Sequence, residues 1–167
     1  GRIFIMPKMS RPLTWTETSV SLVMFLVSWL VAVCTGVTSA VMVTDSGQVL
    51  AGTNDGLLLL EAGADSLVQL RFDGAGLPVT CFGIADRNIF VGTRGHGLWR
   101  FGTGRVLQRV ALVLPEFMEI DPAALSTITC IRQYSDCIYL GTDGYGVFKI
   151  DRSLEVQAHF SLARLPE

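Results

Sequence analysis

The chain has 167 residues, of which half are apolar and 17% are charged, so it is neither a disordered nor a fibrous chain. A formal net charge of −2 offers no clustered basic face, and we expect no nucleic-acid partner. The four cysteines contain no Cys-x-x-Cys pair, so a zinc or redox motif is not indicated and we expect no cofactor.

The first predicted element is an apolar segment near the N-terminus. No charged residue occurs between Thr18 and Thr44, whereas Arg2, Lys8 and Arg11 precede this stretch. Basic residues before an apolar run keep the N-terminus in the cytoplasm and direct the following chain outward. The run is long enough for a hydrophobic helix that spans a membrane. The segment therefore predicts that the rest of the chain is exported.

Two interpretations of residues 1–38 stay open. One is a membrane anchor, and the other is a secretory signal peptide, whose small residues before the cleavage site are present here. The first repeat described below begins near Ser39, which leaves almost no linker after a spanning helix and favours the signal peptide. Under both interpretations, residues 39–167 are periplasmic or extracellular. An uncleaved segment would anchor them in the inner membrane.

The remainder of the chain contains three copies of one pattern. Each copy has a short apolar run that ends in Gly-Thr, then a turn containing glycine, then a second apolar run. The Gly-Thr pairs stand at 52–53, 92–93 and 141–142. Self-similarity at a period of about 40 to 50 residues is typical of repeat architectures.

Each copy can be divided into four short strands, because runs of β-branched and aromatic residues are bounded by Gly, Asn, Asp and Ser. The predicted strands are 40–43, 49–51, 57–60 and 67–70, then 79–84, 89–92, 98–101 and 106–112, then 128–131, 138–140, 147–150 and 154–158. Four antiparallel strands per repeat are the blade of a β-propeller. The predicted fold is all-β, with three blades in an incomplete ring, preceded by the N-terminal hydrophobic helix. The blades cover about 39–76, 77–125 and 126–167.

An insertion lengthens the second copy. Residues 114–125 lie between its last strand and the first strand of the third copy. Insertions of this kind map to loops on one face of a repeat protein. We expect this one to join the face that carries the turns after Gly-Thr.

The Gly-Thr pattern resembles the two-component regulator propeller repeat, which occurs in exported sensor regions of bacterial signalling proteins. The turn 45–49 in the first copy keeps much of that repeat's first turn, and the strands 98–101 and 147–150 resemble the strand after its glycines. The resemblance covers about 39–160. It implies that the chain is the sensor region of a bacterial signal-transduction protein.

The candidate binding residues lie in the turns between the second and third strands. In a four-stranded meander these turns and the connectors between blades share one end, and loops on a rigid scaffold carry recognition. The polar residues there are the predicted ligand-binding residues: Asn54, Asp55, Arg94, His96, Asp143 and Tyr145. The hydroxyls of Thr53, Thr93 and Thr142 are expected to bond to the turn backbone.

The sequence contains no recognisable catalytic constellation. His96 and His159 are the only histidines, and no G-x-S-x-G, P-loop or H-E-x-x-H pattern occurs. We therefore assign no catalytic and no metal-binding residue, and expect a non-enzymatic segment that binds a ligand or partner. The alternatives are a secreted propeller enzyme, a lyase or glycan hydrolase with its catalytic residues in missing blades, and a non-catalytic scaffold propeller.

The end of the third copy predicts how the ring is completed. Leu165-Pro166 matches Leu77-Pro78, which stands directly before the second blade. A further blade is therefore expected next, and the alternative is a second copy of the chain that closes a ring of six. The predicted partners are these blades or this second copy, an unknown ligand on the loop face, and the membrane if residues 1–38 are not cleaved.

Overall fold

The structure is a computed structural model that describes residues 38–161. The signal peptide or anchor predicted at 1–38 thus lies outside the described residues, except for Thr38. Across residues 38–161, helical structure consists of two short 3₁₀ turns, neither of them long and apolar enough to cross a membrane. How the chain is exported or anchored stays a prediction.

The described chain forms three antiparallel sheets of four strands, each a simple meander in chain order. The first sheet contains β1 (Thr38–Val43), β2 (Val49–Thr53), β3 (Gly56–Leu60) and β4 (Leu67–Leu70). The second contains β5 (Val79–Ala85), β6 (Asn88–Thr93), β7 (Leu98–Phe101) and β8 (Leu107–Arg109). The third contains β9 (Ile128–Tyr134), β10 (Cys137–Thr142), β11 (Gly146–Ile150) and β12 (Val156–Phe160). The prediction of an all-β fold with three four-stranded antiparallel sheets is confirmed.

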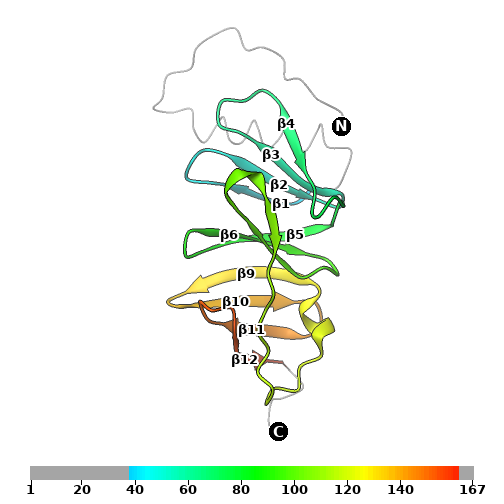
Figure 1. The fold of residues 1–167 in the computed structure, drawn as a ribbon, viewed down its shortest axis with the longest axis vertical. Coiled ribbons are helices and arrows are strands. Elements are labelled where there is room, and N and C mark those ends of the chain that lie inside the picture. The colour runs from blue at the N-terminus through cyan, green and yellow to red at the C-terminus, as the bar shows by residue number, and fades with distance from the viewer. Residues whose placement is uncertain (1–37, 162–167) are drawn as a thin grey trace.

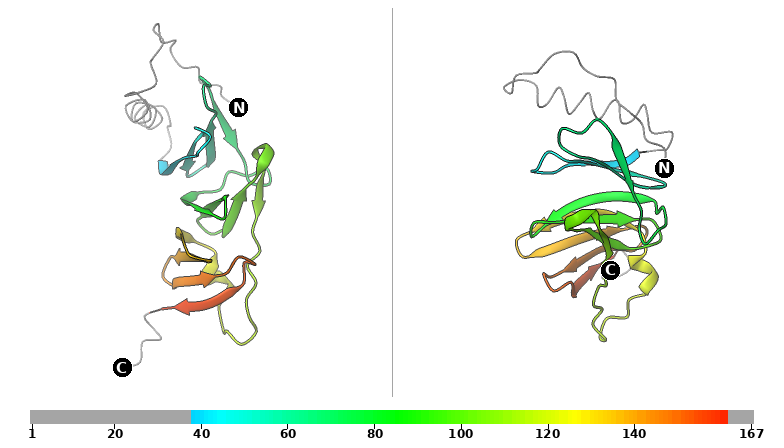
Figure 2. Two further views of the ribbon diagram at one scale, coloured as in Figure 1. Left: turned by 90° about the vertical axis from the view of Figure 1, so that its left-hand side faces the viewer. Right: turned by 45° about the horizontal axis from the view of Figure 1, so that its top comes forward.

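The three sheets are stacked face to face, as blades are in a propeller (Figures 1 and 2). The first strands β1, β5 and β9 lie next to one another at the inner edge of the stack. One apolar cluster joins the first and second blades, and includes an edge-to-face contact of Phe72 with Trp99 at 5.1 Å between ring centroids. A second cluster joins the second and third blades around Phe148 and Leu140. Strands that are buried on both faces explain the continuous apolar runs of the sequence.

The Gly-Thr motif has the same structural role in each blade. The threonine hydroxyl donates to the carbonyl oxygen across the hairpin turn: Thr53 to Gly56 at 3.0 Å, Thr93 to Gly97 at 2.7 Å and Thr142 to Gly146 at 2.9 Å. All three threonines are buried. The prediction that these hydroxyls bond to the turn backbone is confirmed.

The glycine of the motif lets the next blade approach. A Cβ at Gly52 would lie 2.8 Å from the Cβ of Val79, and one at Gly92 would lie 3.1 Å from the Cβ of Ile128. Val79 and Ile128 begin the first strands of the following blades. A glycine within a strand often marks a place where another backbone comes close, and both positions fit that rule.

The connector between β8 and β9 departs from the prediction. We expected the fourth strand of the second blade at 106–112, but β8 ends at Arg109. The chain then crosses to the third blade, where Val113 forms a parallel bridge with Glu155. The Val113 N–H donates to the Leu154 carbonyl and the Val156 N–H to the Val113 carbonyl, both at 2.9 Å. Backbone bonding to the third blade ends the pairing with the second.

The insertion at 114–125 is packed rather than free. Leu114, Met118, Ile120 and Leu125 pack against the apolar cluster that joins the second and third blades. Its last part is the 3₁₀ turn η2 (Pro122–Leu125), where the Asp121 carboxylate accepts from the Ala123 N–H at 2.9 Å. Figure 1 shows the connector running past the second and third sheets. The insertion is a strap between two blades as well as part of a loop face.

The cysteines differ in how far they are exposed to solvent. Cys81 lies between the second and third blades, and burial raises the pKa of its thiol to about 11. Cys130 holds the same position in the third blade but is exposed. Both cysteines stand 11 residues before the glycine of Gly-Thr, and this equivalence in the sequence predicts that both are small buried hydrophobes. Cys81 is half-buried between blades, whereas the prediction is wrong for Cys130, because no described blade covers the third sheet as the third covers the second. Cys81, Cys130 and Cys137 are free thiols.

This difference predicts selective alkylation. At pH 8, iodoacetamide should modify Cys130 at least tenfold faster than Cys81, since the thiolate is the nucleophile and its fraction at Cys81 is roughly one in a thousand. Peptide mass spectrometry over a time course measures both rates in one sample. Unfolding the protein in urea is the control and should equalise them. Equal rates in the folded protein would contradict the packing of Cys81 between blades.

Candidate ligand-binding face

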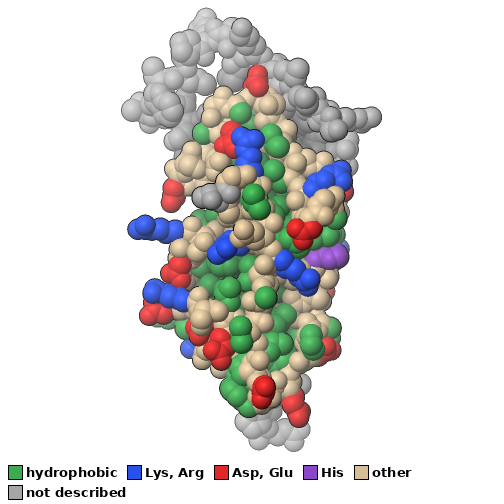
Figure 3. Space-filling view, viewed as in Figure 1, with side chains coloured by type: hydrophobic (Ala, Val, Ile, Leu, Met, Phe, Trp, Pro, Cys, Tyr) green, Lys and Arg blue, Asp and Glu red, His purple; other side chains and the backbone are tan. Residues whose placement is uncertain are grey.

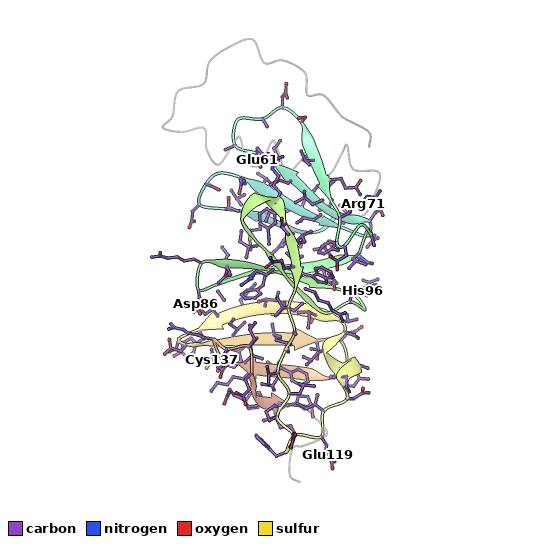
Figure 4. All side chains as sticks on the ribbon, in the orientation of Figure 1. Glu61, Arg71, Asp86, His96, Glu119 and Cys137 are labelled. Atoms are coloured by element: carbon purple, nitrogen blue, oxygen red, sulfur yellow. The ribbon has the colours of Figure 1, made fainter. Side chains whose placement is uncertain are left out.

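The turns after Gly-Thr and the connectors between blades share one end of the stack, as the meander requires. Figure 4 shows His96, in the turn between β6 and β7, at the same end as Arg71, in the connector between β4 and β5. Asp86 and Cys137, beside the hairpins at the other end, lie on the opposite side. We call the end with His96 the loop face.

Backbone bonds tie the turn of the second blade to the connector. The Gly95 N–H donates to the Thr127 hydroxyl at 2.9 Å, and the Gly97 N–H donates to the Ser126 carbonyl at 2.7 Å. Both glycines have positive φ, 80° and 76°, a conformation that residues with a side chain rarely adopt. The Asp143 N–H of the third blade also donates to the Thr127 carbonyl, at 3.2 Å. The segment 126–127 thus joins two turns and holds the loop face together.

A groove of about 440 Å³ lies between the turn 95–98 and the connector. This volume is within the range of roughly 300 to 1,000 Å³ that is usual for small-molecule sites. Its apolar wall includes Leu112, Leu114 and Leu125, and its polar groups include His96 and Arg109. Figure 3 shows hydrophobic side chains gathered over the lower part of the visible face, where the second and third blades lie. The groove combines an apolar surface with an arginine among its lining residues.

The six predicted binding residues do not form one site. His96 lines the groove, and the other five are not among its lining residues: Asn54, Asp55, Arg94, Asp143 and Tyr145. All six are exposed, and they stand in the turns of three separate blades. The loop face that they were expected to share is present. Whether any of them binds a ligand stays a prediction.

Two of the other five residues, Asp55 and Tyr145, accept side-chain hydrogen bonds at their backbone carbonyls. The Asp55 carbonyl accepts from Gln69 Nε2 at 3.0 Å, which links the second hairpin turn to β4. The Tyr145 carbonyl lies 2.6 Å from His159 Nε2, and the His159 ring stacks on Phe148 with 4.1 Å between centroids. These contacts shape the turns of the first and third blades.

Most residues of the groove were missed from the sequence. Arg109 stands in a strand and Leu112 in the connector, so neither was in a turn after Gly-Thr. One usable signal was the insertion itself, because a capped turn with buried Ala124, flanked by leucines, indicates a segment that packs. Residues 38–161 contain no group of three His, Cys, Asp or Glu side chains that could hold a metal ion.

No family model matches the chain, and no curated protein matches it. Solved structures do. The extracellular domain of the hybrid two-component system BT3049 from B. thetaiotaomicron aligns with a TM-score of 0.62 and 21% identity, over 81% of this chain and 17% of that one. The extracellular domain of the one-component system BT4673 from the same organism aligns with a TM-score of 0.58 and 19% identity, over 77% of this chain and 16% of that one.

A third similar structure is an enzyme. Virginiamycin B lyase from Staphylococcus aureus aligns with a TM-score of 0.55 and 13% identity, over 74% of this chain and 40% of that one. These likenesses show the fold, and the two signalling proteins agree with the repeat family that the sequence resembles. The chain spans about a sixth of the length of these extracellular domains. Since one fold supports several functions, the expectation of a non-enzymatic chain stays a prediction.

Proposed function

We propose that this chain is part of an exported sensor region of a bacterial signalling protein and that it binds a small ligand in the groove on the loop face. The groove between the turn 95–98 and the strap is the observation that carries the proposal. The likeness to extracellular domains of signalling systems supports the sensory context.

The groove's chemistry indicates the kind of ligand. Leu112, Leu114 and Leu125 offer an apolar wall, which favours the burial of a ring or hydrocarbon body. Arg109 is among the lining residues, and its guanidinium pairs best with a carboxylate or phosphate. The proposed ligand class is therefore a small molecule with an apolar body and one anionic group.

Benzoate is a suitable probe for this class, because it carries one ring and one carboxylate. Titration into the full chain, followed by ¹H–¹⁵N NMR, should shift the amides of the turn 95–98 and of Leu112. Arg109→Gln should weaken binding about tenfold, the usual value of one charge-assisted hydrogen bond. Arg87→Gln is the matched control, since Arg87 is exposed in the turn between β5 and β6 at the other end of the blade.

Equal binding by wild type and Arg109→Gln would contradict this site. So would shifts confined to residues outside the groove. Loss of binding in both arginine variants would point to general charge attraction instead of recognition at the groove.

A further inference from the structure

A hydroxyl bond links each described blade to the next. The first strand of every blade has an irregularity in its pairing with the second strand, and the residue left unpaired is Ser39, Thr80 or Thr129. Ser39 Oγ donates to the carbonyl oxygen of Val79 in the second blade. Thr80 Oγ1 donates in the same way to the carbonyl oxygen of Ile128 in the third blade. A hydroxyl at the bulge is thus the donor that each blade extends to its successor.

The third blade has this donor without an acceptor. Thr129 occupies the register position of Ser39 and Thr80 and is exposed, and its hydroxyl makes no hydrogen bond to any residue within 38–161. Its pairing with the second strand is irregular at the same point as in the other blades. Thr129 is among the residues that line an inner groove formed by β1, β5 and β9.

The third blade also keeps the glycine that receives a successor. Gly141 is equivalent to Gly52 and Gly92, yet the atoms nearest to a Cβ there belong to Cys130 and Thr129 of its own blade, the first two at 3.3 Å. At Gly52 and Gly92, by contrast, a Cβ would meet the β-branched residue that starts the next blade. A glycine within a strand lowers stability, and it is useful where it allows a neighbouring strand to come close. Gly141 and Thr129 therefore repeat the two features with which the first and second blades contact the first strand of the blade that follows.

The opposite half of this interface stands at the other end of the described chain. Thr38 holds the register position of Val79 and Ile128, is β-branched as they are, and is followed by the bulge at Ser39. Its Oγ1 is buried without a hydrogen-bond partner within the described residues. β1 therefore has the features with which β5 and β9 dock onto the blade before them.

We propose that the outer face of the third blade binds β1 of a second copy of this chain. Thr38 of one copy then packs on Gly141 of the other, and Thr129 Oγ1 donates to the Thr38 carbonyl. The interface continues the two that the chain already contains. Two copies of three blades make a ring of six, within the range of roughly four to eight blades of closed propellers, and a head-to-tail contact that closes forms a finite assembly.

Sedimentation velocity of the full chain from 1 to 200 µM tests the proposal. A dimer is expected, with no larger species. Gly141→Ala should weaken dimerisation at least tenfold, because the added methyl takes the place of the incoming Thr38 and also lies 3.3 Å from the Cβ of Cys130 and the hydroxyl oxygen of Thr129 in its own blade. Thr129→Val should weaken it about three- to tenfold through loss of one hydrogen bond. Both variants should retain the far-UV circular dichroism of the wild type.

Phe117→Ser is the control for association through exposed apolar surface, since Phe117 is 81% exposed in the strap. It should leave the dimer unchanged. A monomer at 200 µM would overturn the proposal and leave the face to a further blade of another chain segment. Association that is unchanged by Gly141→Ala would also overturn it, and would place the contact elsewhere, for example in the apolar segment before residue 38.

Discussion

Phe148→Ala is expected to lower the free energy of unfolding by about 3–5 kcal/mol, the usual cost of removing a buried phenyl ring and leaving a cavity. Phe148 is fully buried in the cluster that joins the second and third blades. Its ring also stacks on His159 with 5° between planes, so the variant loses that contact too. Urea unfolding followed by circular dichroism measures the change from the shift in midpoint.

Phe117→Ala provides the comparison within the same chain. Its ring is 81% exposed, and its removal should change the free energy of unfolding by less than about 0.5 kcal/mol. A loss at Phe148 as small as the loss at Phe117 would contradict a shared core of the second and third blades. A change in the slope of the transition would instead indicate that the third blade unfolds separately.

Gly83→Ala should destabilise the protein by about 1–3 kcal/mol, although it adds one methyl group to the middle of a strand. A Cβ at Gly83 would lie 2.6 Å from the Cβ and 3.0 Å from the carbonyl oxygen of Ile131 in the next blade. Backbone atoms cannot rotate away as a side chain can, so the second and third blades must separate. The same urea experiment measures this loss.

Gly102→Ala is the matched control for this substitution. Gly102 follows β7, and the nearest atom to an added Cβ is the Val106 carbonyl oxygen at 3.6 Å, an ordinary contact. This variant should change stability by less than about 0.5 kcal/mol. Equal effects at Gly83 and Gly102 would show that strand propensity, not the approach of the third blade, decides the cost.

The blade pattern was readable from the sequence because its signals are local. Gly-Thr and the turn after it form one hairpin, and the threonine hydroxyl bonds within that hairpin, as Thr93 does to Gly97. Strand limits agreed within a few residues for the same reason. The exception was 106–112, where Val113 pairs with Glu155 of another blade. No pattern in the residues around Val113 indicates that its pairing partner lies so far along the chain.

In the candidate site, too, the sequence predicted the features that depend on residues close in the chain and missed those that depend on distant residues. The sequence placed His96 in a turn on the loop face, because turn position follows from strand order. It did not place Arg109 or Leu112 beside His96, since their proximity depends on how the strap crosses from one blade to the next. It also gave Cys81 and Cys130 equal roles, whereas the structure covers only the first of them.

The repeat, the four strands of each blade and the end of the blades at which the turns gather follow from the sequence alone, because hairpins are set by residues close in the chain. What lies between the blades became visible in the folded arrangement of the three sheets. This arrangement identified the strap, the groove, and the bond that Ser39 and Thr80 each extend to the following blade. These features depend on the distance between stacked sheets, which the apolar side chains and glycines of both sheets set together.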